Sequence, residues 1–503
     1  MEIKYCSFMM NLVENLQGSR LGRRFSHLID YSSGAANFIL IFTAIAMAFF
    51  LVTVPEVAWI LLGILAGITL LNFPVYTWVI VAFIIASFSR LVSTLELAPS
   101  IINYFHFPLA FGAAFIASTK RNNFHVIARR VRTGVLLLLG LSVVSWLVNG
   151  GEPIRPLLFW IIIVEPFLLI YALMKSPPNQ HGISHLWKLT LFVAFLQVPI
   201  GFWQAFSQGL ADPVQGTFLG LGQGAGAAST VALIGVVVIL SRVIFKVNRR
   251  RRNLFYIVAA VLLLLVPILA DAKHVLAAFL ISVLLVLMNK NLINLKIVVL
   301  GAMIFLVLSI AASYYPALQL IWNPQAAWIV TVRKLEVINI FIKYSQDAPW
   351  AWLIGFGPGN TFSYLALQAE GGIGNPESLI AQVGLSLSKI TEDAINTSFA
   401  TGIRSGMYYL FVERTSAAWQ IWSSWSGIWG DLGCLGFGVY AWLWLLLWKT
   451  LGRSASWQEI SGKVVLLFAL LLGTVYRWLE EPNVMIIVAT VIGATLVSMK
   501  RQR

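Results

Sequence analysis

Long apolar runs recur from residue 36 almost to the end of this 503-residue chain. A helix needs about 20 mostly apolar residues to cross a bilayer, and it satisfies its own backbone hydrogen bonds there. The runs therefore predict an all-α polytopic membrane protein with about 14 transmembrane helices. The predicted spans are 36–54, 56–72, 74–90, 100–118, 134–149, 156–174, 186–207, 226–245, 254–270, 273–289, 295–313, 430–448, 464–478 and 483–498.

Composition excludes several other classes of protein. Hydrophobic residues make up 59% of the chain and charged residues 11%, against about 25% charged in soluble domains. A soluble enzyme, a disordered chain and an ordinary nucleic-acid-binding protein are thereby excluded. The two cysteines, Cys6 and Cys434, exclude a disulfide framework and a cysteine-based zinc site. We also expect no cleaved signal peptide, because residues 1–34 are polar and basic.

The net charge of +15 is distributed unevenly along the chain. With a cytoplasmic N-terminus, the basic clusters near residues 20–24, 120–132, 242–252 and 500–503 all fall on the cytoplasmic side. This pattern is typical of the positive-inside rule, and it predicts two cytoplasmic termini. The predicted segments are a cytoplasmic region 1–34, transmembrane helices over 35–313, a large outer loop 314–428, and transmembrane helices with a cytoplasmic tail over 429–503.

The outer loop 314–428 is far longer than an ordinary connection, and such loops are usually functional. Its apolar periodicity over 327–344 predicts an amphipathic helix at the membrane surface. Gly355 to Gly359 forms a turn cluster. This cluster lacks the lysine and hydroxyl residue of a phosphate-binding loop, so we expect no nucleotide site.

Three polar residues occupy the short connection between the ninth and tenth spans. Asp271, Lys273 and His274 follow one another there, and Asp271 shares a face with His274 if this turn is helical. One interpretation is a polar hairpin tip at the membrane interface. The other is a charged site that opens outward, in which Lys273 binds an anionic group.

Polar residues inside spans are costly in lipid and raise a functional question. Glu165 lies in mid-span before a proline, and His106 lies in the outer half of the fourth span. Glu165 either contributes to a substrate or ion path or is paired with another side chain for structural reasons. His106 is either a proton-transfer group or a packing residue of the helical bundle. Arg90 and the glutamines at 197, 204 and 215 add polarity at outer span ends, which predicts one outward-facing cavity.

The outer loop combines basic residues with many tryptophans. Guanidinium and ammonium groups bind phosphate oxygens with charge assistance, and tryptophan faces offer apolar platforms for sugar rings. The alternatives are a solvated loop surface and an interfacial aromatic belt. No HExxH or Asp-x-Asp pattern occurs, so we expect no metal ion and no cofactor. The basic residues concerned are Arg333, Lys334, Arg404 and Arg414.

Four stretches resemble motifs of the O-antigen polymerase and ligase family of bacterial inner-membrane glycosyltransferases. They are residues 204–218, which end in Gln215-Gly-Thr-Phe218, residues 269–280 with Lys273 as the basic position, Arg333 followed by the glycine turn 353–360, and Gly430-Asp-Leu-Gly-Cys-Leu-Gly-Phe437. The resemblance covers about half of the chain, residues 197–448. The order of the motifs agrees with the predicted topology.

The resemblance implies a metal-independent transferase in the inner membrane that acts on undecaprenyl-diphosphate-linked oligosaccharides at the outer face. Its partners would be that donor, membrane lipids, and polysaccharide export or chain-length proteins, with no nucleic acid. We expect His274 or Asp271 to act as the acid–base group. The expected substrate contacts are Lys273, Arg333, Lys334, Arg404, Arg414, Gln215 and Arg90.

Within the family, a polymerase is favoured over a ligase. Ligases usually carry a histidine late in the outer loop, and 314–428 contains none. An arginine that often precedes the Gly-Thr-Phe sequence is replaced here by Gln215. Two other classes remain as alternatives: a transporter or flippase for lipid-linked sugars, and a non-enzymatic scaffold in polysaccharide export.

Overall fold

The computed structural model describes residues 67, 70, 71, 73–119, 126–210, 213–219, 224–245, 250–289, 324–369, 388–393, 396, 397, 423–452 and 456–502, without the side chains of 244–253, 273, 324–334, 367–369, 501 and 502. The chain divides into two compact units, Met1–Ile68 and Thr69–Arg503. The first unit is described only at Gly67. All elements named below therefore belong to the second unit.

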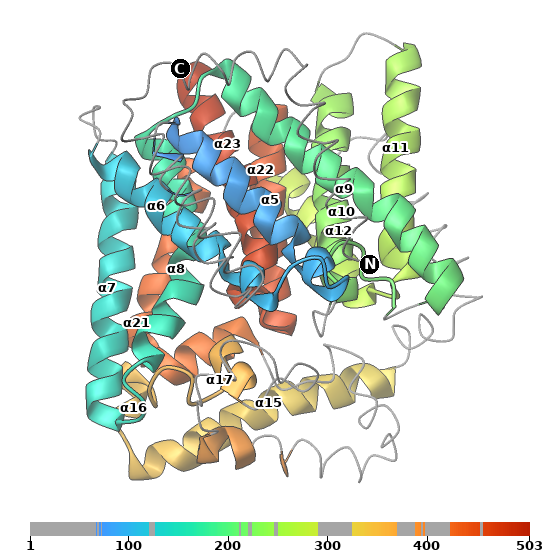
Figure 1. The fold of residues 1–503 in the computed structure, drawn as a ribbon. Coiled ribbons are helices and arrows are strands. Elements are labelled where there is room, and N and C mark those ends of the chain that lie inside the picture. The colour runs from blue at the N-terminus through green and yellow to red at the C-terminus, as the bar shows by residue number, and fades with distance from the viewer. Residues whose placement is uncertain are drawn as a thin grey trace, which may run out of the picture. The chain divides into compact units, whose positions relative to one another are not determined.

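The described part of the second unit is helical and contains no β-strand. Its long helices, shown in Figure 1, are α5 (Val75–Thr94), α6 (His106–Thr119), α7 (Val126–Asn149), α8 (Arg155–Lys175), α9 (Gln180–Gln208), α10 (Gly224–Phe245), α11 (Arg250–Leu269), α12 (Lys273–Asn289), α15 (Pro324–Asp347), α21 (Ser424–Thr450), α22 (Trp457–Val475) and α23 (Pro482–Gln502). Its short helices are η1 (Ser100–Tyr104), α16 (Ala351–Ile354), α17 (Tyr364–Ala369) and η4 (Trp478–Glu480).

Apolar helices of membrane-spanning length dominate the described residues. Nine of them are long and apolar enough to cross a bilayer, and two shorter apolar helices cover 254–269 and 274–289. This confirms an all-helical polytopic membrane protein. The full number of fourteen spans is not confirmed, because 36–54, most of 56–72 and 295–313 lie outside the described residues.

One predicted span was placed too far along the chain. The span 464–478 was expected to include Arg477 and Trp478, but α22 ends at Val475 and Tyr476 has an extended backbone. Residues 476–481 instead form a tight connection that contains η4, before α23 begins at Pro482. Hydropathy alone extended the span because Tyr476 and Trp478 are apolar enough to continue it.

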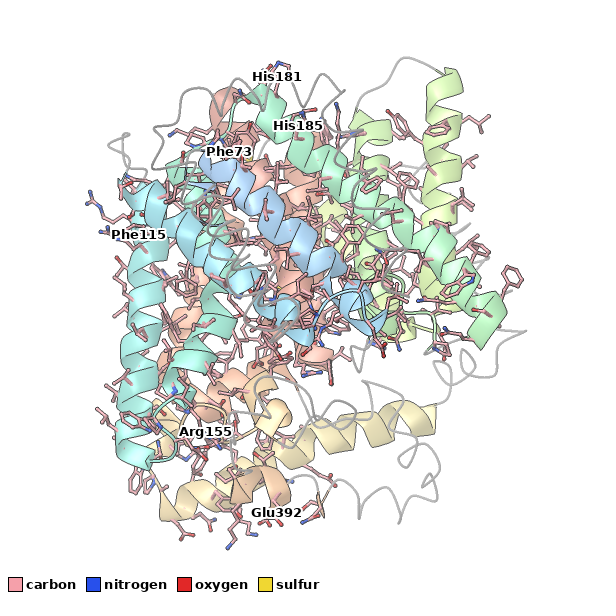
Figure 2. The ribbon with its side chains drawn as sticks, viewed as in Figure 1. Phe73, Phe115, Arg155, His181, His185 and Glu392 are labelled. Carbon is pink, nitrogen blue, oxygen red and sulfur yellow. The ribbon has the colours of Figure 1, made fainter. Side chains whose placement is uncertain are left out.

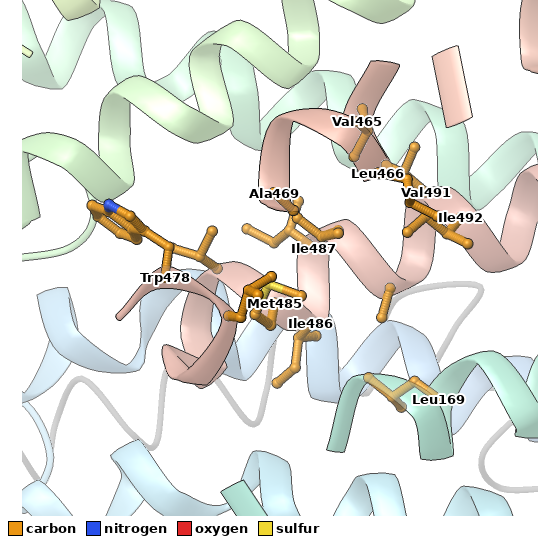
Figure 3. Close-up of a cluster of buried hydrophobic side chains, with 14 of the residues drawn as sticks. Leu169, Val465, Leu466, Ala469, Trp478, Met485, Ile486, Ile487, Val491 and Ile492 are labelled. Carbon is orange, nitrogen blue, oxygen red and sulfur yellow. The ribbon is translucent and has the colours of Figure 1, made fainter. Parts of the chain in front are cut away.

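Helix α23 forms the centre of the core. It packs against α8, α22, α5 and α9, and its membrane-length window is buried throughout. An apolar helix surrounded by other helices needs no polar face, which explains why its sequence is hydrophobic all round. The side chains drawn in Figure 3 include Leu169 of α8, Val465, Leu466 and Ala469 of α22, and Met485, Ile486, Ile487, Val491 and Ile492 of α23.

The helical bundle has two ends with different surroundings. At one end, which we call the loop end, residues 355–364 contact the end of α7 and the starts of α8 and α21. At the other, which we call the tail end, α7 begins and α8, α21 and α23 finish. Figure 2 shows Arg155 and Glu392 at the loop end and His181 and His185 at the tail end. Because α7 has 24 residues, the two ends are separated by about 36 Å.

The helix predicted over 327–344 exists as α15, Pro324–Asp347. Its buried side chains recur at helical spacing and include Val337, Ile340 and Phe341. The Phe341 ring stacks on the Trp429 ring of α21 with centroids 3.9 Å apart, and it also contacts Trp352 and Phe356. At Phe341, the apolar face of α15 is therefore covered by aromatic side chains of the protein itself.

Candidate functional site

The glycine turn at 355–364 is fixed to α21 by one buried carboxylate. Asp431 Oδ2 accepts hydrogen bonds from the Gly359 amide at 2.6 Å and the Ser363 hydroxyl at 2.6 Å. Its Oδ1 accepts from the Thr361 amide at 2.9 Å and the Thr361 hydroxyl at 2.6 Å. Four donors therefore satisfy both oxygens of a carboxylate that is fully buried. Such a cradle compensates the cost of removing the carboxylate from water.

Polar groups at the loop end hold the same turn from other sides. Arg155 Nη1 donates to the Gly359 carbonyl at 2.8 Å and to Asn360 Oδ1 at 2.7 Å, and Arg155 also pairs with Glu152. The Asn149 amide donates to the Gly355 carbonyl at 3.0 Å. The Thr391 hydroxyl donates to the Thr361 carbonyl at 2.8 Å. These contacts make the glycine turn a rigid structural element and confirm the turn predicted from its sequence.

Gly355 in the turn and Gly433 in α21 allow the two backbones to approach closely. Gly433 lies inside α21 with a φ of 63°, and a Cβ there would overlap the Leu353 carbonyl. We expect Gly433→Ala to lower the free energy of unfolding by about 2–3 kcal/mol, because it adds backbone strain to that overlap. Thermal unfolding of the purified protein in detergent measures the change. Gly438→Ala in the same helix is the control, since its Cβ would meet nothing within 4 Å, and an equal loss in both variants would contradict the prediction.

A second polar centre lies in the connection between α22 and α23. Glu480 Oε2 accepts a hydrogen bond from the Tyr364 amide at 2.8 Å. The Ser424 hydroxyl accepts one from the Leu479 amide at 3.0 Å, and the Ser424 amide donates to the Tyr476 carbonyl. The connection is thus attached to α21 and to α17. We call Arg90, Tyr364, Arg477, Glu480 and Glu481 the buried charged cluster.

The guanidinium of Arg477 lies over two aromatic rings. Its Cζ atom lies 4.6 Å from the Tyr364 ring centroid and 5.1 Å from the Tyr476 centroid. Arg477 is only 5% exposed, yet its Nε and Nη1 atoms make no hydrogen bond within the described part of the chain. Ring stacking of this kind orients a guanidinium.

Burial dominates the titration of the two glutamates beside Arg477. It raises the pKa of Glu480 well above its usual value, against the hydrogen bond from the Tyr364 amide. It also raises the pKa of Glu481, and the positive charges of Arg477 and Arg90 and the His106 ring oppose this. Glu480 Oε1 and Glu481 Oε1 are buried and make no hydrogen bond within the described residues.

A buried pair inside the bundle adjoins this cluster. His106, the first residue of α6, places its Nδ1 2.7 Å from Glu165 Oε1. His106 is 2% exposed and Glu165 is fully buried. His106 is therefore a partner for Glu165, as the interpretation of Glu165 as a structurally paired residue requires. His106 is also close enough to Glu481 to oppose the rise in the pKa of that carboxyl group.

The buried charged cluster combines two guanidinium groups with two carboxyl groups of raised pKa. Two guanidinium groups are suited to phosphate oxygens, and a buried carboxyl with a raised pKa is suited to general acid–base catalysis. Most of these groups come from connections at the loop end rather than from the middle of a span. Buried titratable groups with a shifted pKa, some of whose polar atoms make no hydrogen bond among the described residues, are typical of functional sites.

The residues predicted to carry the acid–base step lie elsewhere. Asp271 is in the turn between α11 and α12 with a φ of 49°, and α12 begins only at Lys273. The condition for Asp271 and His274 to share a helical face, a helical turn, is therefore not met. Both are half-buried. The side chain of Lys273 lies outside the described part.

The predicted substrate contacts have mixed outcomes. Arg90, near the end of α5, is brought to the buried charged cluster. Arg333 and Lys334 lie in α15, but their side chains are outside the described part, as are Arg404 and Arg414 altogether. Gln215 lies half-buried in the connection before α10.

Two of the glutamines expected to line a cavity are used within the fold. Gln204 Oε1 accepts from the Gly216 amide at 2.7 Å, and Gln197 Oε1 accepts from the Thr217 amide at 3.0 Å. Both are fully buried. They dock the Gln-Gly-Thr-Phe loop onto α9, so their oxygens are occupied by backbone amides.

Sequence reasoning missed Arg477, Glu480, Glu481 and Tyr364. A signal was present: Arg477-Trp-Leu-Glu-Glu-Pro-Asn483 places three charges in a short connection between two apolar helices. Charged residues at the mouth of a span need partners or a function. The predicted span 464–478 absorbed Arg477 and so hid the cluster.

Comparison with known proteins assigns no family to this chain. No protein-family model matches it, and no curated protein matches it. The described residues also contain no group of three or more His, Cys, Asp or Glu side chains arranged to hold a metal ion. The function is therefore inferred from the site and from the sequence motifs.

Proposed function

We propose that this protein is a lipid-linked glycan polymerase. It would transfer a glycan from undecaprenyl diphosphate to an acceptor sugar hydroxyl at the outer face of the inner membrane, without a metal ion. The observation that carries the proposal is the buried charged cluster, where two arginines and two glutamates with unpartnered atoms meet at the loop end of an apolar bundle. The motif resemblance supports the same class of reaction.

The proposed chemistry follows from the charges. Arg477 and Arg90 bind the diphosphate and stabilise the negative charge that develops on it as it leaves. Glu481 takes the proton from the acceptor hydroxyl, which then bonds to the anomeric carbon while the bond from that carbon to the diphosphate oxygen breaks. Glu480, whose carboxylate holds the Tyr364 amide, positions the aromatic ring beneath the Arg477 guanidinium.

This assignment revises the expected acid–base group. Asp271 and His274 are at a different connection, and neither is among the charged neighbours of Glu481. Arg90 remains in the proposed site. Polymerase is proposed ahead of ligase because of the loop residues noted in the sequence, and ahead of a transporter because the cluster supplies both an anion contact and a base.

Removing either guanidinium should reduce polymer formation strongly. We expect Arg477→Gln and Arg90→Gln each to lower polymer yield about 10- to 100-fold, because a hydrogen bond to a charged group contributes about 1.5–3 kcal/mol. The variants are returned to producing cells from which the chain has been deleted, and surface polymer is measured by chain-length analysis. Arg477→Lys keeps the charge but not the planar fork, and it should recover part of the activity.

The control and the decisive comparison use the same cells. Lys389→Gln removes an exposed positive charge at the loop end and should leave polymer unchanged. If the arginine variants accumulate single glycan units on the outer face, they have lost polymerisation, as proposed. If the units remain on the inner face, the result favours a flippase. Full-length polymer in both arginine variants would overturn the site assignment.

A further inference from the structure

The tail end of the bundle contains a cavity of about 420 Å³ between the ends of four helices. Its walls come from the first turns of α7, the end of α8, and the last turns of α21 and α23. A cavity of this size is within the range of about 300–1,000 Å³ found for small-molecule sites. The buried charged cluster lies at the opposite, loop end of the bundle. The two ends are about 36 Å apart, which is the length of α7.

The cavity combines a basic rim with an apolar floor. Arg130, Lys449 and Lys500 contribute the charges. No aspartate or glutamate is among the lining residues, and none of the three basic residues makes an ion pair within the described part of the chain. The rim therefore carries uncompensated positive charge at a membrane boundary.

The apolar floor lies about one helical turn deeper. Met174, Leu446 and Leu496 line it, and Leu446 and Leu496 precede Lys449 and Lys500 by three and four residues in α21 and α23. This spacing places the charges about 5–6 Å beyond the apolar side chains along the helices. Phosphate at one level and hydrocarbon at the next is the arrangement of a phospholipid at the head-group boundary.

We propose that this cavity binds an anionic phospholipid of the surrounding bilayer. The phosphate would be held by Arg130, Lys449 and Lys500, and the first part of an acyl chain would cover Met174, Leu446 and Leu496. Basic pockets between transmembrane helices are suited to anionic lipid head groups. The bound lipid bridges α7, α8, α21 and α23, and it does so independently of the reaction proposed for the loop end.

Native mass spectrometry of the full chain, stripped of lipid in detergent and titrated with lipid, tests the proposal. Phosphatidylglycerol should bind in preference to phosphatidylcholine. The double variant Lys449→Gln/Lys500→Gln should weaken phosphatidylglycerol binding about 25-fold, since each basic residue near a lipid phosphate contributes a factor of about five. The charge-matched control Lys188→Gln/Lys343→Gln removes two exposed lysines outside the cavity and should leave binding unchanged.

A second variant tests the apolar floor without changing charge. Leu496→Trp fills the cavity and should also weaken phosphatidylglycerol binding, with its unfolding temperature measured to show that it folds. Lys449 also lies in the last turn of α21, where it interacts favourably with the helix dipole. A fall in unfolding temperature with unchanged lipid binding would overturn the proposal in favour of that role. Three other results would also overturn the proposal. The lysine control could lose as much phosphatidylglycerol binding as the cavity variant, or phosphatidylcholine could bind as tightly as phosphatidylglycerol. Inorganic phosphate at the same concentration could also displace the bound lipid.

Discussion

Replacing Asp431 by alanine should destabilise the protein by about 4 kcal/mol, the largest stability effect that we expect from a single substitution. The carboxylate accepts four hydrogen bonds from Gly359, Thr361 and Ser363. Alanine leaves those donors buried and unsatisfied, and each such donor costs about 1–3 kcal/mol before any rearrangement. The turn at 355–364 should then separate from α21.

Asparagine at the same position separates charge from shape. Its Oδ1 can still accept from the Thr361 amide and hydroxyl, but its Nδ2 is a donor and would face the Gly359 amide. We therefore expect Asp431→Asn to cost about 2–3 kcal/mol, less than alanine but well above a surface change. If Asp431→Asn were as stable as the wild type, the Asp431 carboxylate would not hold the glycine turn in the way described.

Thermal unfolding in detergent and limited proteolysis measure these two variants. Cleavage within 355–369 should become faster in Asp431→Ala, because the turn is held chiefly by that carboxylate. The matched control is Asp347→Asn, which changes an exposed aspartate at the end of α15. Its unfolding temperature and its proteolysis should equal those of the wild type.

Glu481→Gln should reduce polymer formation about 10²- to 10⁴-fold, the range for loss of a positioned general base. Glutamine keeps the shape and polarity of the side chain but cannot accept the acceptor hydroxyl proton. In the wild type, burial raises the pKa of Glu481, so activity should fall as the pH falls through that raised pKa. Polymer yield, or transfer in membrane vesicles, is measured across a pH series.

The stability of the same variant should change in the opposite direction. A carboxyl with a raised pKa in the folded state binds protons more tightly there than in the unfolded chain. The stabilisation that Glu481 gives the wild type is therefore complete below the pKa that its carboxyl has in the unfolded chain. It is lost as the pH rises through the higher pKa of that carboxyl in the folded protein. Glutamine cannot ionise, so near neutral pH the variant should unfold at the same temperature as the wild type or higher.

This opposition distinguishes a base from a structural residue. Reduced activity together with reduced stability in Glu481→Gln would mean that the carboxylate holds the fold, and the proposed role would be withdrawn. Glu392→Gln provides the control, because Glu392 is an exposed glutamate at the loop end. It should change neither the activity nor its pH dependence.

Much of the fold was predictable because its signals are local. Helices such as α8 and α10 follow from apolar runs of membrane length, and the α15 helix follows from its 3.6-residue periodicity. Errors occurred where chain geometry overrides hydropathy. The end of α22 at Val475, for example, depends on the extended backbone of Tyr476.

The sequence by itself determined that the chain is a bundle of apolar helices, because hydrophobic length and periodicity act within each segment. Only the tertiary structure decided which polar groups meet. His106 and Glu165 are 59 residues apart, Thr361 and Asp431 are 70 apart, and Tyr364 and Glu480 are 116 apart. A polar side chain buried in such a bundle must find a partner, but its identity depends on how distant helices pack, which no local pattern encodes.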